Sequence, residues 1–215
     1  MRKALLLLAP FVLCGPAWAE KPCKEQVDEA FAKLRNSKAF RLETTIVNAQ
    51  GRLKMQAEYL LPDRMHQKVS VGEESGPMEM IVIGKKAWSN QGQGWAELPE
   101  KFAETVATQM RDTVAEAPKS MTEFKCLGDK EFEGTTYAVY QGILATPLDP
   151  AAEQKGPRVT AVQVPNQQHV YVDKTTGLPA RNIVNSVTEP DKRLFDGRFT
   201  IVDGLKIEAP EIKSN

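Results

Sequence analysis

The segment Gly51–Pro99 reads GRLKMQAEYLLPDRMHQKVSVGEESGPMEMIVIGKKAWSNQGQGWAELP. In its first part, apolar side chains alternate with polar ones: Leu53, Met55, Ala57, Tyr59 and Leu61 against Arg52, Lys54, Gln56 and Glu58. Because successive side chains of a strand point to opposite faces, this alternation predicts a strand with one buried face. Similar patterns follow at Met65–Val71 and Met78–Val82, separated by turns that contain proline or glycine. The segment therefore predicts consecutive antiparallel strands that share a methionine-rich apolar face.

Two segments have the periodicity of a helix instead. We predict one helix at Pro22–Lys38 and a second at Pro99–Ala117, each with one apolar stripe. The stripes consist of Val27, Ala30, Phe31 and Leu34 in the first helix and of Phe102, Val106, Met110 and Val114 in the second. Both helices are amphipathic and could cover the apolar face of a sheet.

The remaining chain adds further strands. We expect them at Phe40–Val47, Thr122–Leu127, Thr135–Leu144, Val159–Val164, Gln168–Asp173, Ala180–Thr188 and Leu194–Val202. We expect Gly128–Gly134 to be a turn, Ala145–Pro157 a long loop, and the tail after Gly204 to be loose. An antiparallel meander of about ten or eleven strands must curl or close. We therefore predict an α+β fold, mainly β: a strongly curved antiparallel sheet, or unclosed β-barrel, covered by amphipathic helices around an apolar cavity.

The amino terminus has the features of an export signal. Arg2 and Lys3 precede an apolar region, Ala4–Leu13, that is shorter than the ~20 residues needed to span a bilayer. Ala17-Trp18-Ala19 fits a cleavage site, so we expect residues 1–19 to be a signal peptide and residues 20–215 to form one periplasmic domain. A retained membrane anchor is the alternative. Lipidation at Cys14 is disfavoured because Leu13 stands where a small residue is required.

Two cysteines remain after removal of the signal, Cys23 and Cys126. In an exported chain two cysteines most simply form one disulfide, which would tie the first helix to the middle of the chain. A C-x-x-C pair, the usual redox motif, is absent from the sequence.

Charge and motifs argue against several classes of function. The chain has 28 Lys and Arg and 28 Asp and Glu residues, and loss of Arg2 and Lys3 leaves a net charge of −2. Nucleic-acid binding requires a basic surface, so we expect no nucleic-acid partner. The two histidines, His66 and His169, lie far apart without further ligands at metal-binding spacing. Nucleophile, phosphate-loop and zinc-protease motifs are also absent, so the sequence predicts neither an enzyme nor a metal or cofactor site.

Methionine is the most informative residue type here. It is flexible and polarisable, and it is common on surfaces that accept ligands of variable shape, such as acyl chains. The alternative is an ordinary core with methionine as filler. Trp88 and Trp95 could form the rim of a cavity or be core residues. The candidate ligand-binding residues are Met55, Tyr59, Met65, Met78, Met80, Val82, Trp88, Trp95, Phe102, Val106 and Met110.

Several short motifs resemble a known family. They are YLLPDR (Tyr59–Arg64), MIVIGKKAW (Met80–Trp88), GWAEL (Gly94–Leu98) and VDKTTGLPAR (Val172–Arg181). With the amino-terminal helix, they resemble the LolA-like superfamily of periplasmic lipoprotein carriers, lipoprotein receptors, mycobacterial glycolipid carriers and an envelope-stress sensor. The resemblance implies an unclosed barrel with a helical lid that binds acyl chains and has no catalytic activity. The lipoprotein carriers have an arginine that holds the lid at the position of Leu61, so this chain departs from them there.

These observations favour a monomeric periplasmic protein that binds the acyl chains of a lipid, glycolipid or lipoprotein in an apolar cavity for transport across the envelope. The alternative function is a regulatory or sensor module that uses the same fold to bind a membrane or lipoprotein partner.

Overall fold

The computed structural model describes residues 21–48, 51–72, 76, 78–115, 123–144 and 165–212, with the side chains of all but residues 113–115 and 144. The expected signal peptide, the expected strand at Val159–Val164 and the expected loop at Ala145–Pro157 lie outside these ranges, as does Met121. The helices are α1 (Cys23–Arg35) and α2 (Glu100–Ala115). The strands are β1 (Ala39–Asn48), β2 (Gly51–Leu60), β3 (Arg64–Val71), β4 (Met78–Ile83), β5 (Lys86–Asn90), β6 (Trp95–Glu97), β7 (Phe124–Phe132), β8 (Thr135–Leu144), β9 (Asn166–Asp173), β10 (Pro179–Ser186) and β11 (Arg193–Ile201).

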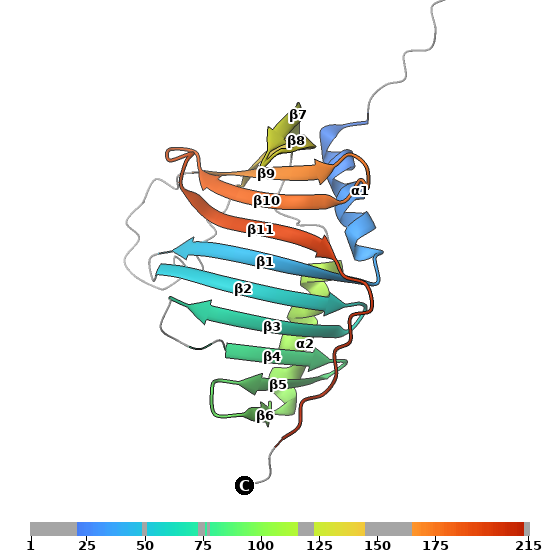
Figure 1. The fold of residues 1–215 in the computed structure, drawn as a ribbon, viewed down its shortest axis with the longest axis vertical. Helices are drawn as coiled ribbons and strands as arrows, with labels where there is room; N and C mark the ends of the chain where they lie inside the picture. Colours follow the sequence, from blue (N-terminus) through green and yellow to red (C-terminus); the bar gives the residue numbers. More distant parts are fainter. Residues whose placement is uncertain are drawn as a thin grey trace, which may run out of the picture.

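All eleven strands belong to one antiparallel sheet in the order β6-β5-β4-β3-β2-β1-β11-β10-β9-β8-β7. The predicted single meander is wrong in one respect, because the sheet consists of two meanders that meet where β1 pairs with β11. The chain passes from β6 at one edge through α2 to β7 at the other edge (Figure 1). Because β6 and β7 do not pair, the sheet is an unclosed half-barrel, as the sequence predicts.

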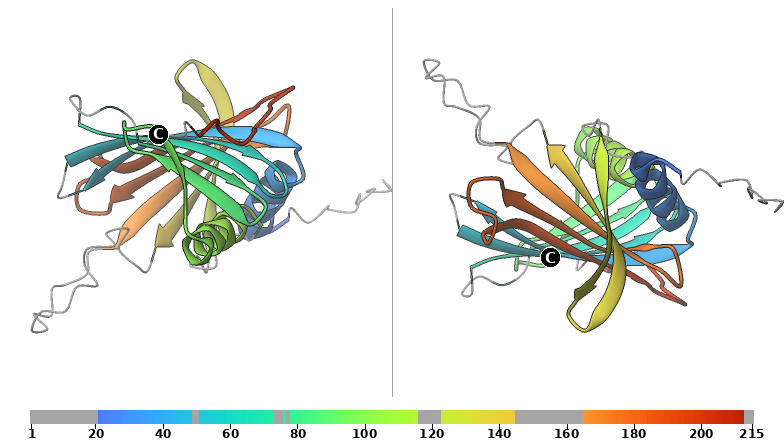
Figure 2. Two further views of the ribbon diagram at one scale, coloured as in Figure 1. Left: turned by 90° about the horizontal axis from the view of Figure 1, so that it is seen from below. Right: turned by 90° about the horizontal axis from the view of Figure 1, so that it is seen from above.

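Both helices pack on the same face of the sheet (Figure 2). α2 lies over β4 and β5, and α1 lies over β7, β9 and β10. The residues of α1 that are buried, Val27, Ala30 and Leu34, all belong to its predicted apolar stripe. At the start of α1, Cys23 forms a disulfide with Cys126 of β7, with the two Cα atoms 5.4 Å apart. The predicted disulfide is therefore present and joins α1 to an edge strand.

The hairpin of β7 and β8 differs from the prediction. The region Gly128–Gly134 was expected to be a turn, but β7 continues through it to Phe132. Only Glu133 and Gly134 form the turn, with φ of 50° and 79°. A two-residue hairpin turn with both φ positive matches the twist of the strands it joins, so a longer turn is not needed. Gly128, with φ of 74°, lies at a break in the β7–β8 register, where a bulge favours glycine.

The carboxyl-terminal segment, residues 202–212, is not loose as the sequence suggested. It crosses the face of the sheet opposite α2 (Figure 1). Ile207 is only 4% exposed and packs against Ile81 and Trp88, with Leu205 beside them. The Arg64 guanidinium donates a hydrogen bond of 2.7 Å to the Ile207 carbonyl. An apolar patch on the outer face of β4 and β5 thus holds the segment in place.

Candidate ligand-binding face

The four predicted methionines of the central strands share one face of the sheet. Strand register aligns Met55 with Val69 and Met78, and it aligns Met65 with Tyr59 and Val82. Met80 lies on the same face, opposite Gln67. This is the face that α2 covers, because Met65 and Val82 form one apolar cluster with the helix. The sequence therefore placed these residues on the correct side of the sheet.

Part of this face is closely packed core. Tyr59, Met65, Val82 and Met110 are each no more than 6% exposed and form one cluster beneath α2. The Tyr59 ring stacks on Phe40 with centroids 4.9 Å apart, and burial raises the pKa of Tyr59 to about 12. These four predicted residues contact neighbouring side chains, so they support the helix beside any bound ligand.

The contact surface of α2 consists mainly of alanine. Ala103 and Ala107 are 2% and 0% exposed, and Val106 is partly buried beside them. Phe102, which was predicted to face the cavity, is 67% exposed and does not belong to the cluster beneath α2. The small alanine side chains let the helix approach the sheet closely, and the binding role of Phe102 stays a prediction.

Beyond α2, apolar side chains of the same face become accessible. We call Met55, Val69, Val71, Met78 and Met80 the methionine strip. Met78 is 45% exposed and Val71 is 43% exposed, whereas Met55, Val69 and Met80 are half-buried. Large exposed apolar side chains that lie together on a folded protein often mark a binding surface. Met55, Met78 and Met80 belong to the predicted site and have accessible side chains here, whereas Val69 and Val71 were not predicted.

Trp88 and Trp95 are not part of this face. Register pairs Trp88 with Ile81 on the outer face of the sheet, and Trp95 packs in the same outer cluster. The carboxyl-terminal segment covers Trp88, which is 6% exposed. Of the two alternatives that the sequence left open, rim or core, the structure places both tryptophans in a core cluster of the outer face, which packs against that segment.

A row of polar side chains that sequence analysis did not identify continues from the strip. Thr44 on β1 pairs with Met55 on one side and with Gly197 of β11 on the other. Asn182 of β10 pairs in turn with Gly197. The Gln168 amide donates a hydrogen bond of 2.6 Å to the Asn182 side-chain oxygen. Thr44 and Gln168 are 4% and 3% exposed. Their positions in the period-two pattern would have placed them on the covered face.

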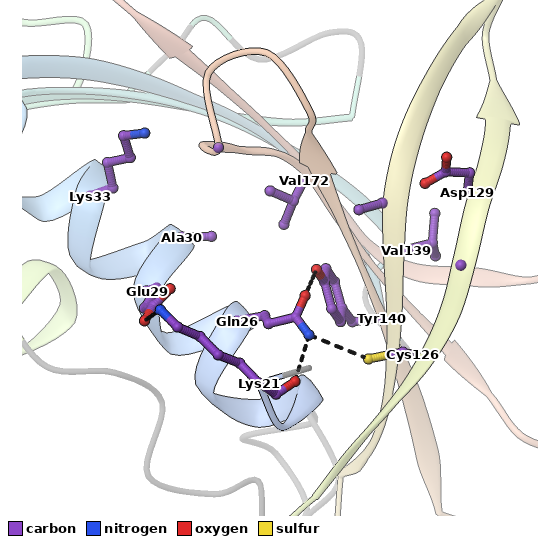
Figure 3. A pocket seen from close by; sticks show the side chains of 13 residues that line it. Lys21, Gln26, Glu29, Ala30, Lys33, Cys126, Asp129, Val139, Tyr140 and Val172 are labelled. Atoms are coloured by element: carbon purple, nitrogen blue, oxygen red, sulfur yellow. Dashed lines mark hydrogen bonds and ion pairs between the residues drawn. The ribbon is translucent and has the colours of Figure 1, made fainter. Parts of the chain in front are cut away.

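A pocket of about 630 Å³ lies between α1 and the β7–β8 hairpin (Figure 3). Gln26 accepts a hydrogen bond of 2.7 Å from the Tyr140 hydroxyl and donates one to the Lys21 carbonyl. Burial, with a smaller contribution from Asp129, raises the pKa of Tyr140. The pocket was not predicted, because its residues come together only when the disulfide docks α1.

The described residues offer little for catalysis. Both histidines lie on the outer face, where His66 contacts Glu79 at 2.8 Å and His169 lies 3.3 Å from the Gln141 amide nitrogen. Within the described ranges, no cluster of three or more His, Cys, Asp or Glu residues could hold a metal ion. Neither described helix is long and apolar enough to cross a membrane.

The position of Leu61 bears on how the helices are held. Leu61 packs against the core beneath α2. Arg64, the nearest arginine, points to the outer face and bonds the carboxyl-terminal segment there. Leu61 has no guanidinium, and the guanidinium of Arg64 lies on the face away from the helices. Neither residue can therefore hold the helices as the resemblance implies for the arginine of the lipoprotein carriers.

No protein-family model and no curated protein sequence matches the chain. Among solved structures, LprF from Mycobacterium bovis is similar with a TM-score of 0.54 and 11% identity, over 89% of this chain and 99% of that one. The lipoprotein LppX from Mycobacterium tuberculosis is similar with a TM-score of 0.51 and 10% identity, over 86% of this chain and 97% of that one. The similarity covers nearly the whole of both structures, so it shows that the chain shares their fold, and the predicted unclosed half-barrel is confirmed.

Proposed function

We propose that this chain is a periplasmic protein that binds the acyl chains of a lipid, glycolipid or lipoprotein on the helix-covered face of its half-barrel. The observation that carries the proposal is the methionine strip, which stays exposed beside a well-packed core. Burying exposed apolar surface against an acyl chain is favourable by about 25 cal/mol per Å². Methionine side chains adapt to chains of different length and branching, so they suit a carrier with varied cargo.

The two helices support this function in different ways. α1 is joined to β7 by the disulfide and to β8 through Gln26 and Tyr140. α2 contacts the sheet chiefly through small side chains, Ala103 and Ala107, with Met110 at its far end. Among the described residues no disulfide joins α2 to the sheet, so α2 is the helix that can shift to admit a chain. α1 then acts as the fixed wall.

The expected location fits the same proposal. An export signal would deliver the chain to an oxidising compartment, and the Cys23–Cys126 disulfide is of the kind that persists there. Transport across the envelope requires a container for acyl chains in an aqueous space. LppX, whose fold this chain shares, is itself described as a lipoprotein, which is consistent with an envelope location.

The direct test is mass spectrometry of an organic extract from the purified protein, together with uptake of a fluorescent acyl probe. Met55→Glu places a carboxylate in the methionine strip and should reduce probe binding at least tenfold. Gln56→Glu, the next residue on β2, places the same carboxylate on the outer face and serves as the matched control. If the extract contains no lipid and the wild-type protein takes up no probe, the proposal is wrong.

One observation favours the alternative function, a regulatory module that binds a membrane or lipoprotein partner. Phe102 is the most exposed large apolar side chain among the described residues, and it lies in the first turn of α2. Phe102→Ser should weaken capture of one stoichiometric partner from solubilised envelopes and leave acyl-probe binding unchanged. Recovery of no partner by the wild-type bait would count against this function.

A further inference from the structure

Nine residues form a continuous row across the helix-covered face, one from each of nine neighbouring strands. In order from β4 to β7, the central row consists of Met78, Val69, Met55, Thr44, Gly197, Asn182, Val170, Tyr140 and Cys126. Its first three members belong to the methionine strip. In the middle of the row, the side chain of Thr44 is polar and buried and that of Asn182 is polar and half-buried. An extended molecule that lies across the strands would therefore contact an apolar surface and then a polar one.

Two buried polar atoms in this region have no hydrogen-bond partner. They are the Thr44 hydroxyl oxygen, Oγ1, and the Gln168 side-chain oxygen, Oε1. The other end of the Gln168 amide is bonded to Asn182, so that amide lies beside the row. Buried polar atoms are almost always hydrogen-bonded in folded proteins, and an exception requires a physical reason. A polar group of a bound ligand would supply the missing partners.

The chemistry of these atoms restricts that group. An amide oxygen can only accept a hydrogen bond, and a threonine hydroxyl can donate or accept. None of the nine residues of the central row carries a charge. A carboxylate or phosphate accepts but does not donate, and it would find no cation in this row to offset its burial. The matching ligand group is uncharged and carries O–H or N–H donors.

Gly197 lies between Thr44 and Asn182 in the row, so a head group that contacts both would have to lie above it. These two residues are separated by two strand spacings, or about 10 Å. A β-carbon added to Gly197 would lie 2.8 Å from the Phe195 ring and 3.2 Å from a methyl group of Leu42. Side chains rather than backbone therefore occupy this space. Rotation of the half-buried Phe195 ring would open it.

We propose that Thr44, Asn182 and Gln168 form a head-group site for an uncharged amphiphile with hydrogen-bond donors, such as an acylglycerol. Its acyl chain lies along the methionine strip, which begins at Met55, the direct neighbour of Thr44. The inference rests on the proposed acyl-binding function and adds the chemical class of the ligand.

The test compares two ligands that have the same chain and different heads, monododecanoylglycerol and dodecanoate. Isothermal titration calorimetry at mildly alkaline pH, where dodecanoate is ionised, should give about tenfold tighter binding of the glycerol ester. Thr44→Val keeps the shape and removes the hydroxyl, so it should weaken binding of the ester about tenfold without affecting dodecanoate. Thr45→Val, on the outer face of the same strand, should change neither affinity.

Because Thr44→Val also removes an unpartnered buried hydroxyl, the variant should be at least as stable as the wild type, which excludes misfolding as the cause. Gln168→Met removes the unpartnered amide oxygen and should independently abolish the preference for the glycerol ester over dodecanoate. Equal affinity of the wild type for the two ligands, or an unchanged preference in both variants, would overturn the head-group site. In that case, if the wild type binds both ligands and Met55→Glu abolishes this binding, the proposed acyl-binding function still holds. If the wild type binds neither ligand, the acyl-binding function itself is wrong.

Discussion

The Tyr140 hydroxyl on β8 donates a hydrogen bond of 2.7 Å to the side-chain oxygen of Gln26 on α1. Gln26 follows Cys23 by one helical turn, so α1 is fixed to the sheet at two neighbouring points, one covalent and one polar. Tyr140→Phe removes the hydrogen bond and should lower the free energy of unfolding by about 1 kcal/mol. Urea unfolding of Tyr140→Phe, Gln26→Leu and the double variant would measure the coupling between the residues. Additive losses would contradict a direct interaction.

The disulfide should contribute more than any single polar contact. It closes a loop of 103 residues, and loss of a long-loop disulfide typically costs about 2 to 5 kcal/mol. The double variant Cys23→Ser, Cys126→Ser avoids a free thiol and should unfold at correspondingly lower urea concentration. Reduction of the wild-type protein should reproduce the effect. A loss below about 1 kcal/mol would show that other contacts hold α1.

The packing of α2 depends on the small size of its buried residues. Ala107 is completely buried against the sheet. Ala107→Leu should destabilise the protein by about 1 to 3 kcal/mol, because overpacked cores force side chains from their preferred rotamers. Asp112→Leu adds the same side chain on the exposed face of the helix and is the control. If both variants unfold at the wild-type temperature in a thermal melt, the alanine contact is not close-packed.

The carboxyl-terminal segment should contribute to stability despite its irregular backbone. Ile207→Ala removes a side chain that is 4% exposed and should cost about 2 to 5 kcal/mol. It should also shift tryptophan fluorescence to the red, because Trp88 loses its cover. Ile212→Ala, at a position that is 49% exposed, should change stability by less than about 0.5 kcal/mol. Equal effects of the two substitutions would indicate that the segment is not anchored at Ile207.

Stability should also fall as the solution becomes acidic. Burial holds the pKa of His169 below its ordinary value of 6.5. The unfolded chain therefore binds a proton at pH values where the folded chain does not, and stability is lost as the pH falls below about 6.5. His169→Gln should flatten this loss in urea unfolding measured at a series of pH values. Gln167→Asn, on the same strand, should retain the wild-type slope, and an unchanged slope in His169→Gln would refute the assignment.

The sequence predicted the central strands well because alternation is a local signal. The pattern from Leu53 to Leu61 identifies both the strand and its buried face without knowledge of the rest of the chain. The pairing of β1 with β11 has no such signal, since it joins segments at opposite ends of the domain. Nothing in either strand alone indicates that the sheet is two meanders rather than one.

The exposure of Phe102 and the burial of Trp88 have a common physical cause that the sequence pattern does not show. A residue is buried only if another element covers it, and that element can be distant and irregular. Trp88 lies on the outer face with Ile81, but its cover is Ile207, in a segment without periodicity. On α2, Phe102 has the stronger apolar character, yet Ala107 makes the contact because a small side chain allows a shorter distance between helix and sheet.

The pairing of β1 with β11 sets a constraint on when the fold can be completed. β1 to β6 are made first and pair consecutively, but one edge of β1 stays open until the last strand arrives. An open strand edge can pair with a second chain, and contacts between distant segments form slowly. Completion of the sheet therefore depends on β11, and the edge of β1 is open to pairing with a second chain until β11 docks.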